Sequence, residues 1–159
     1  MFDYREIFPY FESVSLPNLY VLKLLQRFPK VLILRMHSKV TTAELARFLD
    51  ITKNSLQEFQ QEESIVDFTK LFRNLTLSTL RKLKFTNTKK LIEDVDIRAL
   101  VVATPNLVSL DLSGIPSMTN SLVEMVCKGL PKIEEFILLR NTKVTNDVFV
   151  FFGKFLPKL

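Results

Sequence analysis

The chain has 159 residues, of which 47% are hydrophobic and 25% are charged, as is typical of globular proteins and not of disordered ones. No apolar run reaches the ~20 residues that a bilayer-spanning helix needs, and the N-terminus lacks a basic region followed by an apolar one, so we expect neither a transmembrane segment nor a secretory signal. The only cysteine, Cys127, excludes an internal disulfide, and three glycines leave no glycine-rich phosphate loop. A cytoplasmic protein is therefore expected, with the nucleus as a second compartment.

The net charge of +5 is concentrated in one stretch of the sequence. Residues 70–90 hold seven of the 22 basic residues and no acidic residue, whereas the rest of the chain is close to balanced. Such a stretch favours contact with an acidic protein or with nucleic acid.

The first 30 residues are predicted to form an N-terminal helical cap. Residues 15–28 have apolar side chains at helical spacing and end at Pro29, because proline disfavours helix in the residue before it. Residues 1–12 are expected to pack across the unit that follows.

From residue 31 onward, an internal repeat of 24 to 27 residues organises the chain. Apolar residues stand at offsets 0, 3 and 5 in LRKLKF (80–85), LVSLDL (107–112) and IEEFIL (133–138), with poorer copies beginning at residues 31 and 56. These segments are predicted strands. The predicted units are 31–55, 56–79, 80–106, 107–132 and 133–158, and residue 159 opens a sixth.

The second half of each unit predicts an amphipathic helix. Apolar residues recur at offsets 11, 15, 19 and 23, and steps of four residues lie on one helical face. In the third unit this buried face comprises Leu91, Val95, Ala99 and Ala103. The predicted helix starts are marked by Thr41 with Glu44, Ser64 with Asp67, Thr119, and Thr145.

These motifs resemble those of leucine-rich repeat proteins, whose strand motif is L-x-x-L-x-L. The segments MTNSLVEMVCKGLPKIEEFIL and VTNDVFVFFGKFLPKL are similar to the cysteine-containing subclass found in F-box and other cullin-ligase substrate receptors. The resemblance implies an α/β fold, a leucine-rich repeat solenoid (horseshoe) with a parallel β-sheet on the concave face and helices on the convex face. It also implies a role with a cullin-ligase adaptor, and residues 15–24 are faintly similar to an elongin-binding box. Because the chain stops where a sixth strand would open, we expect either a fragment of a longer protein or an end covered by a partner.

No group of residues in the sequence supports catalysis. His37 is the only histidine, and Cys127 falls on a helix far from it, so neither a Ser-His-Asp nor a Cys-His arrangement is expected. We expect no enzyme activity, no metal site and no cofactor.

The candidate binding residues follow from strand alternation, since the motif's other apolar positions face the core. Glu58 is expected to meet Lys82, and Lys84 to meet Asp111, on neighbouring parallel strands. Two large aliphatic residues, Ile137 and Leu139, occupy the same face, where they indicate a protein contact or shielding by a following unit. The predicted partner-binding residues are Arg35, His37, Glu58, Gln60, Lys82, Lys84, Asp111, Glu135, Ile137 and Leu139.

The sequence therefore predicts a non-enzymatic protein–protein interaction module that binds a protein or peptide through this face. The alternative is binding of nucleic acid or an acidic partner through the basic third unit. Nucleic acid is the less favoured partner because the cations are spread over at least two faces.

Overall fold

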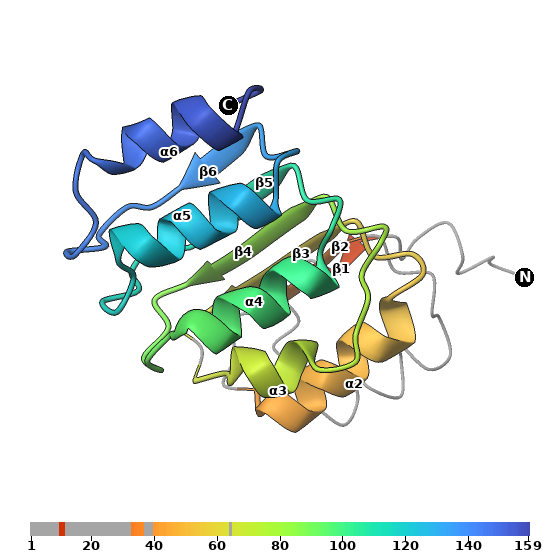
Figure 1. The fold of residues 1–159 in the computed structure, drawn as a ribbon. Helices are drawn as coiled ribbons and strands as arrows, with labels where there is room; N and C mark the ends of the chain where they lie inside the picture. The colour runs from red at the N-terminus through yellow and green to blue at the C-terminus, as the bar shows by residue number, and fades with distance from the viewer. Residues whose placement is uncertain (1–9, 12–32, 37–39, 64) are drawn as a thin grey trace, which may run out of the picture.

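The computed structural model describes residues 10–11, 33–36, 40–63 and 65–159. Short strands alternate with helices along the chain (Figure 1). The strands are β1 (Tyr10–Phe11), β2 (Ile33–Met36), β3 (Glu58–Glu62), β4 (Lys82–Thr86), β5 (Ser109–Asp111) and β6 (Glu135–Ile137). The helices are α2 (Thr42–Thr52), α3 (Phe68–Phe72), α4 (Asp94–Ala103), α5 (Asn120–Gly129) and α6 (Val148–Phe155).

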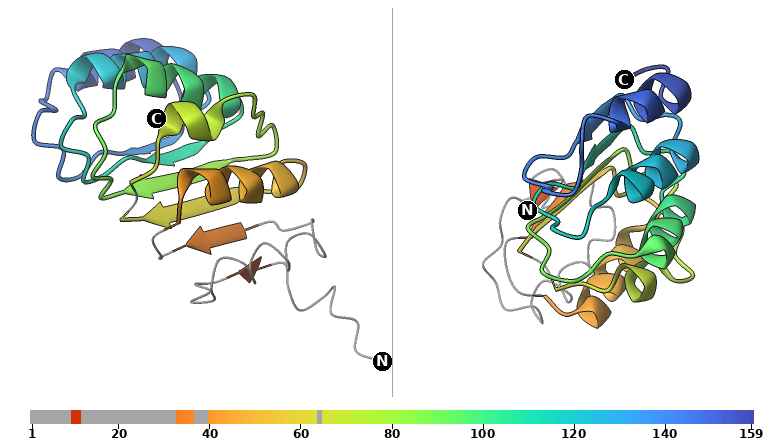
Figure 2. Two further views of the ribbon diagram at one scale, coloured as in Figure 1. Left: turned by 90° about the horizontal axis from the view of Figure 1, so that it is seen from below. Right: turned by 60° about the vertical axis from the view of Figure 1, so that its left-hand side comes forward.

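All described strands belong to one parallel sheet. Its order, β1-β2-β3-β4-β5-β6, follows the chain, so each helix connects two neighbouring strands. The helices lie together on one side of this sheet, which the right-hand view of Figure 2 shows most clearly. The opposite face is not covered by any described helix.

The predicted leucine-rich repeat horseshoe is wrong. The described chain forms a small α/β domain in which a few short strands, of two to five residues each, alternate with helices. A solenoid arc arises when nearly identical units repeat the same small rotation. Here the helices range from five residues in α3 to 11 in α2, so successive units differ in shape.

The core lies between the sheet and the helices, and phenylalanine fills much of it. Phe48, Phe59 and Phe85 are buried, as the sequence predicts. The ring centroids of Phe59 and Phe85 are 5.5 Å apart, and those of Phe68 and Phe85 are 4.7 Å apart, within the range of favourable aromatic contacts. Towards the C-terminus the same role is only partly filled: Phe136, Phe152 and Phe155 are half-buried.

Two of the predicted helix starts are confirmed. The Thr41 side chain accepts a hydrogen bond from the Glu44 backbone N–H, and the Glu44 carboxylate accepts one from the Thr41 backbone N–H, which forms a capping box. Thr119 caps α5 through the Leu122 N–H. The Thr145 prediction is wrong, because α6 begins only at Val148. The Ser64 prediction lies outside the described residues.

The predicted buried face of α4 is also wrong by one position. Leu91 and Val95 are exposed, whereas Ile92 and Asp96 are buried. The physical reason is length, because unit 80–106 has 27 residues and unit 107–132 has 26. The additional residue lies before α4 and shifts the helix by one position, about 100° around its axis.

The predicted N-terminal cap over 1–30 lies outside the described residues, apart from β1. Tyr10–Phe11 pairs with Ile33–Leu34 as a short parallel strand that the sequence did not predict. None of the helices in the described part has the length and apolar character that a bilayer crossing requires.

Candidate functional site

The uncovered side of the sheet, called the open face below, carries the predicted binding residues. Along β3 and β4, buried residues alternate with partly or fully exposed ones, because successive strand side chains point to opposite sides. The buried members face the helices, and the exposed members form the open face. Its described residues are Arg35, Glu58, Gln60, Glu62, Lys82, Lys84, Ser109, Asp111, Glu135 and Ile137.

Charges of opposite sign alternate across the first row of the open face. The Glu58 carboxylate lies 3.4 Å from Lys82 Nζ on one side and 4.0 Å from Arg35 Nη2 on the other. Farther along the row, the Ser109 hydroxyl donates a hydrogen bond to Glu135 at 2.5 Å. The predicted pairing of Glu58 with Lys82 is confirmed.

The second row is centred on Lys84. Its Nζ lies 3.8 Å from Asp111 Oδ2 and 3.7 Å from Glu62 Oε1, so the predicted pairing of Lys84 with Asp111 is also confirmed. Glu62 additionally accepts a hydrogen bond from Gln60 Nε2 at 2.8 Å. These partly exposed pairs each contribute about 0–1 kcal/mol to stability, so their main effect is to hold the side chains in place.

A shallow concavity of about 220 Å³ gathers most of the predicted residues. It is lined by Arg35, Glu58, Gln60, Lys82, Lys84, Asp111, Glu135 and Ile137 together with Phe59, Leu83 and Ser109. Leu139 lies outside it, beyond the end of β6. His37 lies outside the described residues.

The apolar end of the open face is held by its backbone. The Leu139 N–H donates to Ser113 Oγ at 3.1 Å, and its carbonyl accepts from the Gly114 N–H at 2.8 Å. Gly114 has a φ of +68°, a conformation that glycine adopts without steric cost. With its backbone fixed in this way, the Leu139 side chain is 67% exposed.

The described residues contain little that suggests chemistry. No group of three or more His, Cys, Asp or Glu side chains within the described ranges is arranged to hold a metal ion. Cys127 is buried on α5, and this burial raises the pKa of its thiol to about 12. At neutral pH the sulfur is therefore protonated and a poor nucleophile.

Sequence reasoning missed a second surface, a groove between α3 and α4. Exposed apolar residues line it, among them Leu91, Val95 and Val102. Its signal was present in the unit lengths, since a unit of 24 residues (56–79) precedes one of 27 (80–106).

Comparison with known proteins found no protein family model that matches the chain and no curated protein that matches it.

Proposed function

We propose that this chain is a non-enzymatic interaction module that binds a protein or peptide through the open face of its sheet. The observation that carries the proposal is the exposed Leu139 beside the half-buried Ile137, at the end of an ordered row of charged side chains. An apolar anchor flanked by oriented polar groups is typical of protein contacts.

Prior organisation of the face favours binding. The carboxylates of Glu58 and Asp111 and the ammonium groups of Lys82 and Lys84 already have partners across the strands. Side chains that are ordered before binding lose less conformational entropy when a partner arrives. A peptide laid across the strands would meet alternating charges first and the aliphatic pair at β6.

The alternative, nucleic-acid binding through the third unit, has weaker support. Phosphate binding relies on cations that are free to neutralise it, with release of counterions. Lys82 and Lys84 lie beside Glu58, Glu62 and Asp111 instead, so acidic side chains already neutralise them. We expect no salt-sensitive retention of single-stranded RNA or duplex DNA in a filter-binding assay.

The test compares proteins retained by the wild-type chain with those retained by Leu139→Asp. A charge at this anchor is expected to lower the retention of a specific partner at least about tenfold, since truncation or burial of charge at a hot spot has this magnitude. Affinity purification followed by quantitative mass spectrometry measures it. Lys82→Glu is expected to have a smaller effect, because it alters the polar part of the face.

Ile65→Asp is the matched control. Ile65 is an aliphatic residue with 64% exposure, close to that of Leu139, and it lies in the connection before α3. A partner lost with Leu139→Asp and kept with Ile65→Asp supports the open face. If the retained proteins are the same for all three chains, the open face is not the binding surface.

We also propose substrate recognition within a ubiquitin ligase as the cellular setting, on the sequence resemblance alone. The segment 15–24 that resembles an elongin-binding box lies outside the described residues. Co-purification with elongin or Skp-type adaptors from cells is expected, and it should not depend on Leu139. Absence of both adaptors from the purified material would remove this setting and leave the binding module untouched.

A further inference from the structure

The largest cavity in the described structure is the α3–α4 groove, on the helical side of the molecule and away from the open face. Its volume is about 860 Å³. Leu91, Val95 and Val102 line it and are 60%, 54% and 74% exposed, which is high for aliphatic side chains. A contiguous apolar surface of this kind marks an interaction site more often than a scattered apolar residue does.

The groove exists because α3 is too short to cover α4. The two helices are held together near their starts, where Asp96 Oδ1 accepts hydrogen bonds from the Thr69 N–H at 2.8 Å and from the Thr69 hydroxyl at 2.7 Å. From this point α4 continues to Ala103, whereas α3 ends at Phe72. Figure 1 shows the short α3 alongside the longer α4.

The apolar residues of the groove follow a helical stripe. Leu91, Val95, Arg98 and Val102 are spaced by four, three and four residues, so they lie on one side of α4. The one-position shift that sends Ile92 and Asp96 inward turns this stripe outward. At 1.5 Å per residue, the stripe extends over about 16 Å, or three helical turns.

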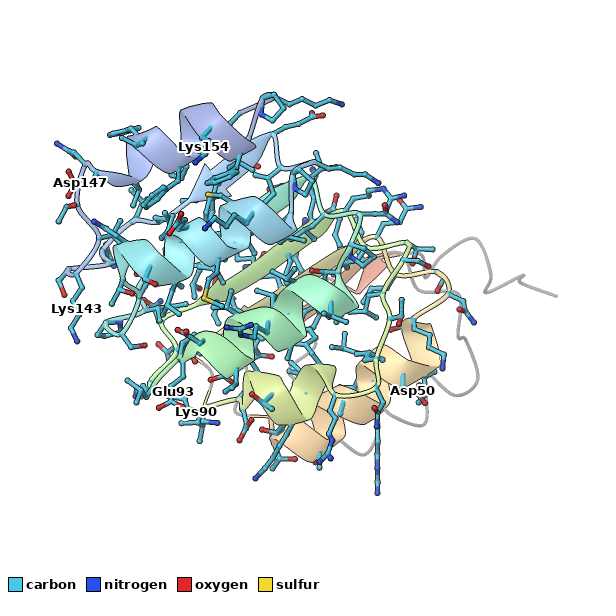
Figure 3. All side chains as sticks on the ribbon, viewed as in Figure 1. Asp50, Lys90, Glu93, Lys143, Asp147 and Lys154 are labelled. Carbon is cyan, nitrogen blue, oxygen red and sulfur yellow. The ribbon has the colours of Figure 1, made fainter. Side chains whose placement is uncertain are left out.

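Charges at the two ends of the groove differ in how they are neutralised. At the end where both helices begin, Asp67 lies 2.6 Å from Lys90 Nζ and 3.8 Å from Lys70 Nζ, and Figure 3 labels Lys90 and Glu93 at this end. Farther along, Arg73 and Arg98 also line the groove. Neither guanidinium has an ion pair or a hydrogen bond to any described residue. The groove thus combines an apolar floor with arginines that lack acidic partners.

We propose that the α3–α4 groove binds an amphipathic helical segment of a partner protein whose apolar stripe is flanked by acidic residues. The apolar stripe of the segment packs on Val95 and Val102, in the way that helices occupy hydrophobic grooves. Its flanking carboxylates pair with Arg73 and Arg98, for which a planar two-oxygen acceptor is the best match. This surface is separate from the open face, so the chain would join two partners.

Two synthetic peptides test the proposal, with the full 159-residue chain as the receptor. Both are stapled helices with leucines at i, i+3, i+4 and i+7; the flanking positions are glutamate in one and lysine in the other. In fluorescence anisotropy titrations, the glutamate peptide is expected to bind at least tenfold more tightly than the lysine peptide. Arg98→Glu is expected to reverse this preference, which a purely apolar site would not do.

A matched pair of exposed valines separates the groove from general stickiness. Val102→Asp should weaken binding of the glutamate peptide at least tenfold, whereas Val150→Asp, at a position on α6 with 68% exposure, should leave it unchanged. Circular dichroism confirms that each variant is folded. Equal binding of the two peptides, binding of neither, or equal effects of the two valine changes would overturn the proposal.

Other occupants of the groove give different results in the same set of proteins. Self-association in sedimentation velocity that Val102→Asp abolishes would assign the groove to a second copy of the chain. Co-sedimentation with vesicles of phosphatidylcholine and phosphatidylserine that Arg98→Glu abolishes would assign it to a membrane surface. Either result contradicts a helical protein segment as the occupant.

Discussion

At the residue scale, a few buried polar side chains fix how neighbouring units join. Asn141 is buried, its side-chain oxygen accepts from the Ile115 N–H at 2.7 Å, and its amide donates to the Leu112 carbonyl at 2.8 Å. Asp96 has the same kind of role between α3 and α4, and its second oxygen also accepts from the Glu93 N–H at 3.2 Å. Buried polar groups with such partners specify one arrangement, because any other would leave them unpaired.

Cys127 gives a prediction about pH at this same scale. Burial raises the pKa of its thiol to about 12, whereas the unfolded chain has a cysteine pKa of about 8.5. Between these values the unfolded state binds fewer protons than the folded state, so the free energy of unfolding falls as pH rises. The loss attributable to Cys127 should approach about 1 kcal/mol per pH unit above pH 9.

Urea unfolding at pH 7 and pH 10 measures this loss, with Cys127→Ala as the comparison. The variant is less stable at both pH values because it leaves a cavity, but its stability should change less between them. The difference between the two proteins isolates the thiol from lysines and tyrosines, which titrate in both. An identical pH dependence for the two proteins would show that the thiol titrates normally when folded.

At the element scale, the approach of α4 to α5 depends on one glycine. A methyl group at Gly129 would overlap the Val101 side chain on α4. Replacement by alanine removes the conformational cost of glycine in a helix, worth about 1 kcal/mol, but overpacking costs about 1–3 kcal/mol. Because Val101 is β-branched and stiff, we expect the overlap to dominate, and Gly129→Ala should lower the free energy of unfolding.

Thermal and urea denaturation measure this effect, and α6 provides the control. Gly153 also lies within a helix, but nothing approaches within 4 Å of the position that its Cβ would take. Gly153→Ala should therefore be neutral or stabilising. In a Val101→Ala background the cost of Gly129→Ala should largely disappear; if it persists there, the two side-chain positions are not coupled.

The elements also show how far sequence reasoning reached. Strand alternation placed Glu58 beside Lys82 and Lys84 beside Asp111, because a period of two leaves no freedom once the buried residues are known. The same reasoning failed for α4, where a single added residue turned Leu91 and Val95 to solvent. Helix length was equally hidden: nothing local in the sequence stops α3 at Phe72, and this stop creates the groove. The horseshoe failed for a related reason, since an apolar repeat does not fix the lengths and rotations that set curvature.

At the scale of the whole molecule, polar and apolar surfaces are divided between two sides. Cations on the open face are balanced by carboxylates across the strands, whereas Arg73 and Arg98 on the helical side have no described partners. The basic excess at 70–90 thus separates into neutralised lysines on one side and available arginines on the other. This division explains why net charge alone was a poor guide to the binding surface.

Burial also varies along the molecule, and this variation predicts uneven local stability. Helix α5 buries Leu122, Val123, Val126 and Cys127, whereas Val148 is the only buried residue of α6. Local opening requires less free energy where fewer apolar contacts are lost. Native-state hydrogen exchange should therefore be at least about tenfold faster for amides of α6 than for those of α5, a difference of about 1.4 kcal/mol in opening free energy. The measurement is repeated at two protein concentrations, because a second copy that covers Phe149 and Val150 would slow exchange in α6 only at the higher one. Equal protection of α5 and α6 at both concentrations would contradict the link between burial and local stability in this domain.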